Sequence, residues 1–68
     1  MHPIREYRLA QPIPLRQSDI AAKIGVSAVQ VSRYESGIKR VPAEKAVVIE
    51  KEFGIPRERI RPDIFATG

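Results

Sequence analysis

The chain has 68 residues, no cysteine and one histidine. This length allows one domain, which we place over residues 1–68. Without cysteine, disulfides and thiolate zinc sites are excluded, and a single histidine excludes a multi-histidine site, so we expect no metal and no cofactor. No apolar run has membrane-spanning length, and the charged first ten residues lack the apolar stretch of a signal peptide. We therefore expect a cytoplasmic protein with a core of packed helices.

The net charge of +4 is unevenly distributed along the chain. Residues 1–40 hold seven basic and three acidic side chains, whereas residues 41–68 hold five of each. A basic segment of this kind favours a polyanionic partner such as nucleic acid. Ordinary surface charge would give a similar total, so the charge alone does not select a function.

The first predicted helix covers residues 4–10 and follows Pro3, a residue that the first turn of a helix tolerates. Pro12 and Pro14 each remove a backbone donor and push the preceding residue towards extended geometry. Residues 11–14 are therefore predicted to form a stiff connector, and we expect Ile13 and Leu15 to turn inward.

The second predicted helix covers residues 16–24, with a buried stripe at three- and four-residue spacing. The stripe consists of Ile20, Ala21 and Ile24. Gly25 is expected to end this helix because glycine adopts the left-handed conformation without steric cost. Ser27 is a favourable N-cap for a third helix over residues 28–36. This succession predicts a helix-turn-helix over residues 16–36.

The remaining chain is also predicted to be helical. Pro42 opens a fourth helix that ends at Gly54, and residues 56–60 form a short fifth turn followed by a tail over residues 61–65. The predicted fold is all-α, with five short helices around the helix-turn-helix. Because the segment after Gly54 is short, an α+β fold with a C-terminal β-hairpin after Gly54 is the alternative.

The third predicted helix has two different faces. Val31, Tyr34 and Glu35 form its inner face, and the outer face carries small, hydroxylated or basic residues. We predict base-reading roles for Ser27, Ala28, Val29, Ser32 and Arg33. Arg33 can donate a bidentate pair to guanine, and the small neighbours let the helix approach base edges in the major groove. A solvent-facing helix is the alternative, but Val29 gains nothing from exposure to water.

Residues around this helix are candidates for contacts with DNA phosphates. Gln17 lies in the first turn of the second helix, where free backbone N–H groups and the helix dipole attract anions. The full predicted set is Arg16, Gln17, Gln30, Lys39 and Arg40. On the inner face, the carboxylate of Glu35 needs a partner, and Arg8 of the first helix is the candidate for a structural ion pair.

Two segments resemble a known family. Residues 15–37, LRQSDIAAKIGVSAVQVSRYESG, resemble the Cro/CI-type helix-turn-helix of phage repressors, the lambda repressor-like group. The continuation VPAEKAVVIEKEFGIPRERIRPDIF is similar to the Cro-like and YdaS-antitoxin branch. The resemblance implies a phosphate contact at Gln17, base contacts by the outer-face residues and a buried Arg8–Glu35 pair. The chain departs from the family in having two prolines in the first connector and a less polar outer face.

These observations predict a sequence-specific transcriptional repressor that binds double-stranded DNA. We expect a homodimer on a near-palindromic operator, with no membrane and no small-molecule ligand. An antitoxin or protein-interaction module on the same fold is the alternative, since Ile64 and Phe65 either cover the core or contact another chain. Catalysis is not expected, because the candidate side chains form no spaced cluster and His2 is expected to be idle.

Overall fold

The structure, a computed structural model, describes residues 1–66, and these residues contain helices and no strands. The helices are α1 (Pro3–Ala10), α2 (Gln17–Ile24), α3 (Ala28–Ser36), α4 (Ala43–Phe53), α5 (Arg57–Ile60) and α6 (Pro62–Phe65). The all-α prediction is confirmed, and the segment after Gly54 forms two short helices in place of the alternative hairpin. None of the helices in residues 1–66 has the length and apolar character needed to span a bilayer.

The ends of the helices follow from local chemistry. Ser27 caps α3, because its Oγ accepts a hydrogen bond of 3.2 Å from the N–H of Gln30. Gly25 ends α2 with a φ of 72°, which is the left-handed conformation that glycine favours. His2 caps α1, because its Nδ1 accepts from the N–H of Ile4 at 3.1 Å. His2 therefore has a structural role as a helix cap, which was not predicted from the sequence.

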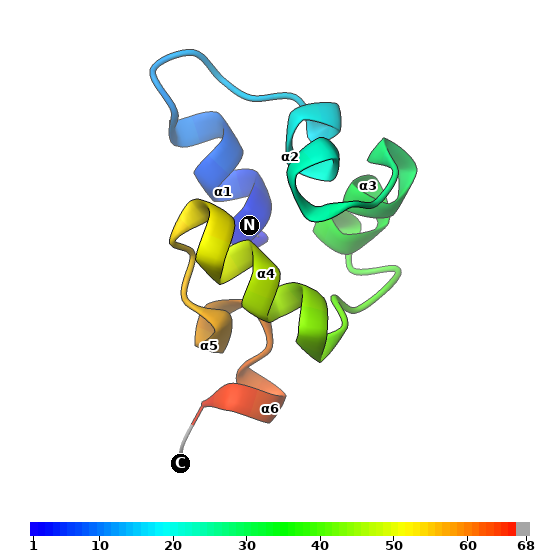
Figure 1. Cartoon of the computed structure of the whole chain (residues 1–68), viewed down its shortest axis with the longest axis vertical. Helices are drawn as coiled ribbons and strands as arrows, with labels where there is room; N and C mark the ends of the chain where they lie inside the picture. Colours follow the sequence, from blue (N-terminus) through cyan, green and yellow to red (C-terminus); the bar gives the residue numbers. More distant parts are fainter. Residues whose placement is uncertain (67–68) are drawn as a thin grey trace.

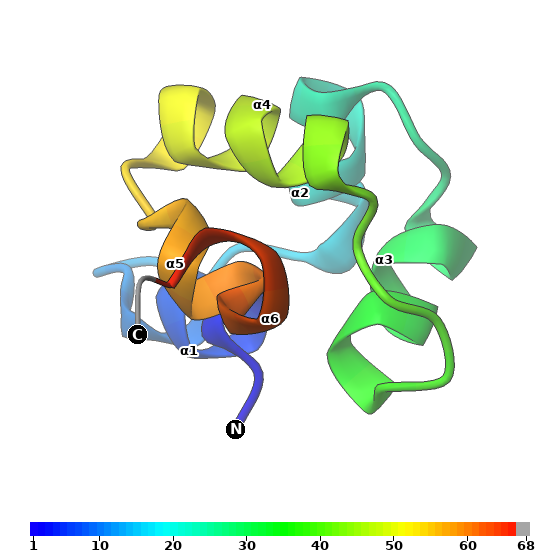
Figure 2. The same ribbon diagram turned by 90° about the horizontal axis from the view of Figure 1, so that it is seen from below.

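The core lies between α1, α2, α3, α4 and α5. It consists of the buried side chains of Ile4, Ile20, Ala21, Ile24, Val31, Tyr34, Val41, Ala46, Ile49, Ile55 and Ile60. Helix α2 packs most extensively against α3 and also against α4, while α5 joins α1 and α4. As a result, α3 and the loop over residues 37–41 lie at one edge of the molecule, α5 lies beside α1 and α4, and α6 packs against α5 (Figures 1 and 2).

Two predictions, one about the first connector and one about residues 61–65, are wrong. Ile13 does not turn inward, since its side chain is 83% exposed. The proline-rich connector loops away from the core, whereas Leu15 packs against the core as expected, and its N–H donates to the carbonyl of Arg8 at 3.0 Å. Residues 61–65 were predicted to form a tail without regular structure, but Pro62–Phe65 forms α6. Residues 1–66 therefore contain six helices where five were predicted.

Candidate nucleic-acid interface

Helix α3 presents one face to the core and one to solvent. Val31 is fully buried and Tyr34 is 2% exposed, because both pack into the core. On the opposite face Val29 is 58% exposed, Ser32 and Arg33 are also exposed, and Ala28 is half-buried. The outer strip, defined as Ala28, Val29, Ser32 and Arg33, is therefore accessible along the edge of the protein.

Two further polar residues at the start of α3, Ser27 and Gln30, each have only part of the side chain available to DNA. The oxygen of Ser27 is used as a helix cap, but its hydroxyl hydrogen remains free to donate. Gln30 is half-buried, and its Oε1 is enclosed without a hydrogen-bond partner among the described residues. A phosphate contact by Gln30 would therefore use the amide nitrogen, which carries the hydrogens that an anion needs.

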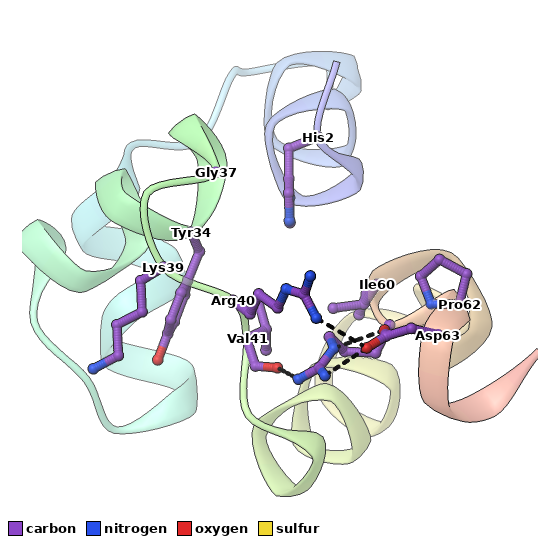
Figure 3. A pocket seen from close by; sticks show the side chains of 10 residues that line it. His2, Tyr34, Gly37, Lys39, Arg40, Val41, Ile60, Pro62 and Asp63 are labelled. Carbon is purple, nitrogen blue, oxygen red and sulfur yellow. Dashed lines mark hydrogen bonds and ion pairs between the residues drawn. The ribbon is translucent and has the colours of Figure 1, made fainter.

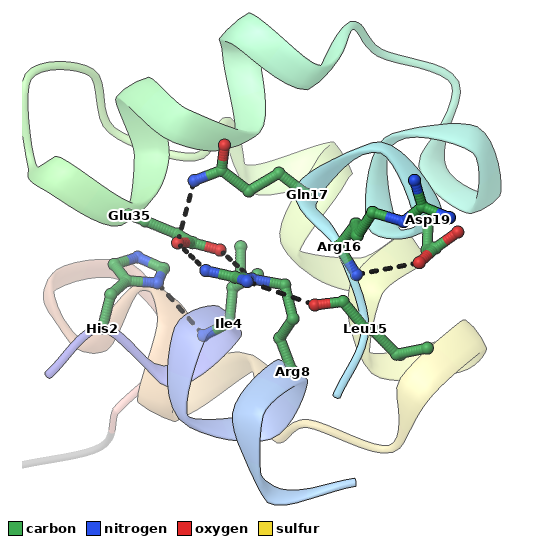
Figure 4. Close-up of polar contacts among 8 residues, drawn as sticks. All are labelled: His2, Ile4, Arg8, Leu15, Arg16, Gln17, Asp19 and Glu35. Atoms are coloured by element: carbon green, nitrogen blue, oxygen red, sulfur yellow. Dashed lines mark hydrogen bonds and ion pairs between the residues drawn. The ribbon is translucent and has the colours of Figure 1, made fainter. Parts of the chain in front are cut away.

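The N-terminus of α2 holds a second group of candidate contacts (Figure 4). Arg16 is exposed at the N-cap, where its N–H donates to Oδ2 of Asp19 at 2.8 Å. The first turn of an α-helix leaves backbone N–H groups without intrahelical partners, here including that of Gln17. The Gln17 side chain is half-buried and donates from Nε2 to Oε1 of Glu35 at 3.2 Å, so one of its two amide hydrogens is engaged.

Arg8 and Glu35 form an ion pair between α1 and α3 (Figure 4). Nε of Arg8 donates to Oε2 of Glu35 at 3.0 Å, and Nη2 donates to Oε1 at 2.9 Å. Nη1 donates to the carbonyl of Leu15 at 3.1 Å, so the same guanidinium also holds the segment that precedes α2. Burial raises the pKa of Glu35, but the hydrogen bonds from Arg8 and Gln17 and the charge of Arg8 outweigh it and lower the pKa overall.

The loop over residues 37–41, the basic loop, carries two exposed basic side chains. Lys39 and Arg40 both lie at the surface, and the Arg40 side chain is 79% exposed. The loop borders a pocket of about 340 Å³ whose far wall is made by residues of α5 and α6 (Figure 3). In this pocket Arg61 donates to the carbonyl of Val41 at 2.7 Å and holds Asp63 through two hydrogen bonds of 2.9 and 2.8 Å.

A comparison with protein families matches residues 4–60 to the helix-turn-helix family of Cro/CI type. The chain belongs to this family. Its members are DNA-binding regulators, and a helix-turn-helix domain implies a double-stranded DNA partner. Comparisons with curated proteins and with solved structures found no match. The family assignment agrees with the geometry, because α2 and α3 are the two helices of the motif.

The two apolar side chains of α6 in this helix-turn-helix protein, Ile64 and Phe65, differ in solvent accessibility. Phe65 packs against the core, and the guanidinium carbon of Arg57 lies 5.5 Å from the centre of its ring. Ile64 is 48% exposed. Of the two predicted dimer contacts, Ile64 is thus the one that offers more surface to another chain.

Several residues that shape this surface were missed by sequence reasoning. Lys45 donates from Nζ to the carbonyl of Ile24 at 2.8 Å and so completes the end of α2. Arg61 contacts Val41 and Asp63 contacts Arg40, so they connect the last helix to the basic loop across 20 and 23 residues of sequence. A contact between a lysine and a helix-end carbonyl, or an ion pair between residues distant in the chain, leaves no periodic signal in the sequence.

Residues 1–66 contain no group of three or more histidine, cysteine, aspartate or glutamate side chains placed to hold a metal ion.

Proposed function

We propose that this chain is a sequence-specific repressor of Cro type that reads the major groove of double-stranded DNA with α3. The observation that carries the proposal is the outer strip of α3. In this strip Val29 is 58% exposed and lies beside exposed Ser32 and Arg33. Together they form a surface of short and polar side chains that can contact DNA bases. The family assignment supports DNA as the partner.

Specific roles follow from side-chain chemistry. Arg33 is assigned to guanine, since its guanidinium can donate to O6 and N7 together. Ala28 and Val29 are assigned to thymine methyl groups, and the hydroxyls of Ser27 and Ser32 to base edges.

The backbone contacts lie on either side of the reading helix. We assign the N-terminus of α2, with Arg16 and Gln17, to a phosphate before the reading helix, and Lys39 and Arg40 to the backbone beyond it. Gln30 is assigned to a phosphate at the edge of the strip. These contacts would set the register of the protein on DNA and provide most of the salt-dependent affinity.

The proposed regulator acts as a homodimer on a near-palindromic operator. Its principal extents are 35 × 23 × 20 Å, so two copies fit on one side of a duplex with reading helices one helical turn, or about 34 Å, apart. Ile64 is proposed as a contact between the copies. Occupancy of such an operator would repress transcription by excluding polymerase.

The test is selection of bound duplexes from a random pool, followed by affinity measurements on the selected and a scrambled duplex at two salt concentrations. We expect an enriched motif with two-fold symmetry and an affinity that falls steeply as salt rises. A pool that stays random contradicts sequence-specific reading. Failure to bind any duplex, or affinity indifferent to salt, contradicts DNA binding and favours a protein-interaction module.

A further inference from the structure

Asp63 lies beside the basic loop that the proposed function assigns to the DNA backbone. Its Oδ2 is 3.4 Å from Nη1 of Arg40 (Figure 3). The Arg40 side chain is 79% exposed and that of Asp63 is 46% exposed. Arg40 therefore meets a carboxylate of its own chain at a point where solvent, and a phosphate, can also reach it.

Arg61, not Arg40, holds Asp63 in place. Nε and Nη2 of Arg61 donate to the two carboxylate oxygens at 2.9 and 2.8 Å, whereas Arg40 makes one longer contact. The Arg61 side chain is 15% exposed, and its Nη1 donates to the carbonyl of buried Val41 at 2.7 Å. The carboxylate is thus fixed relative to the loop, while the long Arg40 side chain can move away from it.

We infer that Asp63 acts as an internal substitute for a DNA phosphate, holding Arg40 in the free protein and limiting affinity for DNA. The inference rests on the proposed function, since it takes Arg40 as a backbone contact. A carboxylate and a phosphate both offer anionic oxygens to a guanidinium, so they compete for the same donors. Arg40 must give up Asp63 before it makes a full contact with DNA.

The competition should respond to salt. The hydrogen bonds from Arg61 lower the pKa of Asp63 to about 2, so the carboxylate stays charged at neutral pH. Interactions between exposed charges are screened as ionic strength rises. The restraint that Asp63 places on Arg40 is therefore strongest at low salt.

The experiment compares Asp63→Asn with Glu58→Gln, a matched control that removes a negative charge from an exposed residue of α5. The readout is affinity for a random-sequence duplex at 50 and 300 mM salt. We expect Asp63→Asn to bind about two- to fivefold more tightly at low salt, as expected for an exposed ion pair, with a smaller gain at high salt. The gain from Glu58→Gln should be clearly smaller.

A second comparison tests whether the effect passes through Arg40. In an Arg40→Gln background, the gain from Asp63→Asn should fall to that of Glu58→Gln, which reflects only the loss of one negative charge. The inference is overturned if Asp63→Asn gives the same gain with or without Arg40, or, with Arg40 present, no more gain than Glu58→Gln. If the unmodified chain binds no duplex at all, the proposed function itself fails.

Urea unfolding of each variant separates these results from a folding defect. If Asp63→Asn does not fold, Asp63→Ser takes its place, because the serine hydroxyl still offers Arg61 an acceptor without a charge.

Discussion

Arg33 is the residue with the largest assigned role in specificity. It lies on the exposed outer strip of α3, and its guanidinium can make two parallel hydrogen bonds to one guanine. Arg33→Ala should weaken binding to the selected operator by about 1–3 kcal/mol and relax discrimination at one base position. The measurement is fluorescence anisotropy with the operator and with single-base variants of it.

Lys39→Ala is the matched comparison for Arg33→Ala, because it also removes one exposed positive charge. As a phosphate contact, Lys39 should affect all sequences alike, and its loss should reduce the slope of log affinity against log salt by about 0.9. The assignment of Arg33 to a base would be wrong if the two variants lowered affinity for operator and scrambled duplex in the same proportion.

His2 provides a test of stability at the scale of one residue. Its Nδ1 accepts the Ile4 N–H only while the imidazole is neutral, and burial lowers its pKa from the ordinary value of 6.5. Below pH 6.5 the unfolded chain therefore takes up the proton before the folded one does. We expect the unfolding free energy to fall as pH drops from 6.5 through the lowered pKa, by up to about 1 kcal/mol, the usual contribution of an N-cap.

Asn in place of His2 should cap α1 without titrating. The expected result for His2→Asn is a flat stability profile between pH 7 and 5, measured by urea unfolding. The same slope in His2→Asn and in the unmodified chain would show that another group is responsible.

At the scale of elements, the Arg8–Glu35 pair connects α1 to α3 and, through Leu15, to the start of α2. The side chains are 14% and 5% exposed, so removing one partner leaves the other poorly solvated. Glu35→Gln should lower the unfolding free energy by roughly 2–4 kcal/mol near pH 7. The lowered pKa of Glu35 adds a pH dependence, since its stabilisation is complete above the ordinary carboxyl pKa of 4.5 and is lost as pH falls through the lowered value.

The double variant Arg8→Met with Glu35→Leu is the control for that prediction. Replacing both members of a buried pair with apolar side chains avoids the unpaired charge, so part of the lost stability should return, less the loss of the hydrogen bonds to Leu15 and from Gln17. Urea unfolding at pH 7 and at pH 4 measures both effects. A cost below about 0.5 kcal/mol for Glu35→Gln, the size expected of an ordinary surface substitution, would show that the pair contributes little to stability.

At the scale of the whole molecule, the proposed dimer makes a prediction about DNA geometry. Two reading helices on one side of B-DNA must lie about 10 base pairs apart from centre to centre. Inserting five base pairs between the half-sites of the selected operator should turn one half-site to the opposite side and reduce affinity to that of a single half-site. Inserting ten restores the facing but moves the half-sites a further helical turn apart, so affinity should again fall to that of a single half-site. An operator with either insertion that bound as tightly as the selected operator would contradict a symmetric dimer of fixed spacing.

Much of the fold was predictable because its signals are local. The stripe of Ile20, Ala21 and Ile24 and the turn at Gly25 lie within a few residues of each other, and the structure buries the stripe and ends α2 at this glycine. The outer strip of α3 was predictable in the same way, since helical periodicity places its members on one face. Its role in reading DNA stays a prediction.

The sequence by itself determined a helix-turn-helix and the helices before Gly54, because periodic apolar spacing and helix-ending glycines act over short distances. Only the tertiary structure decided that Ile13 faces solvent, that Gln17 bonds to Glu35 and that Arg61 fixes Asp63 beside Arg40. These contacts join residues that are distant in the chain, and their geometry depends on how the helices pack.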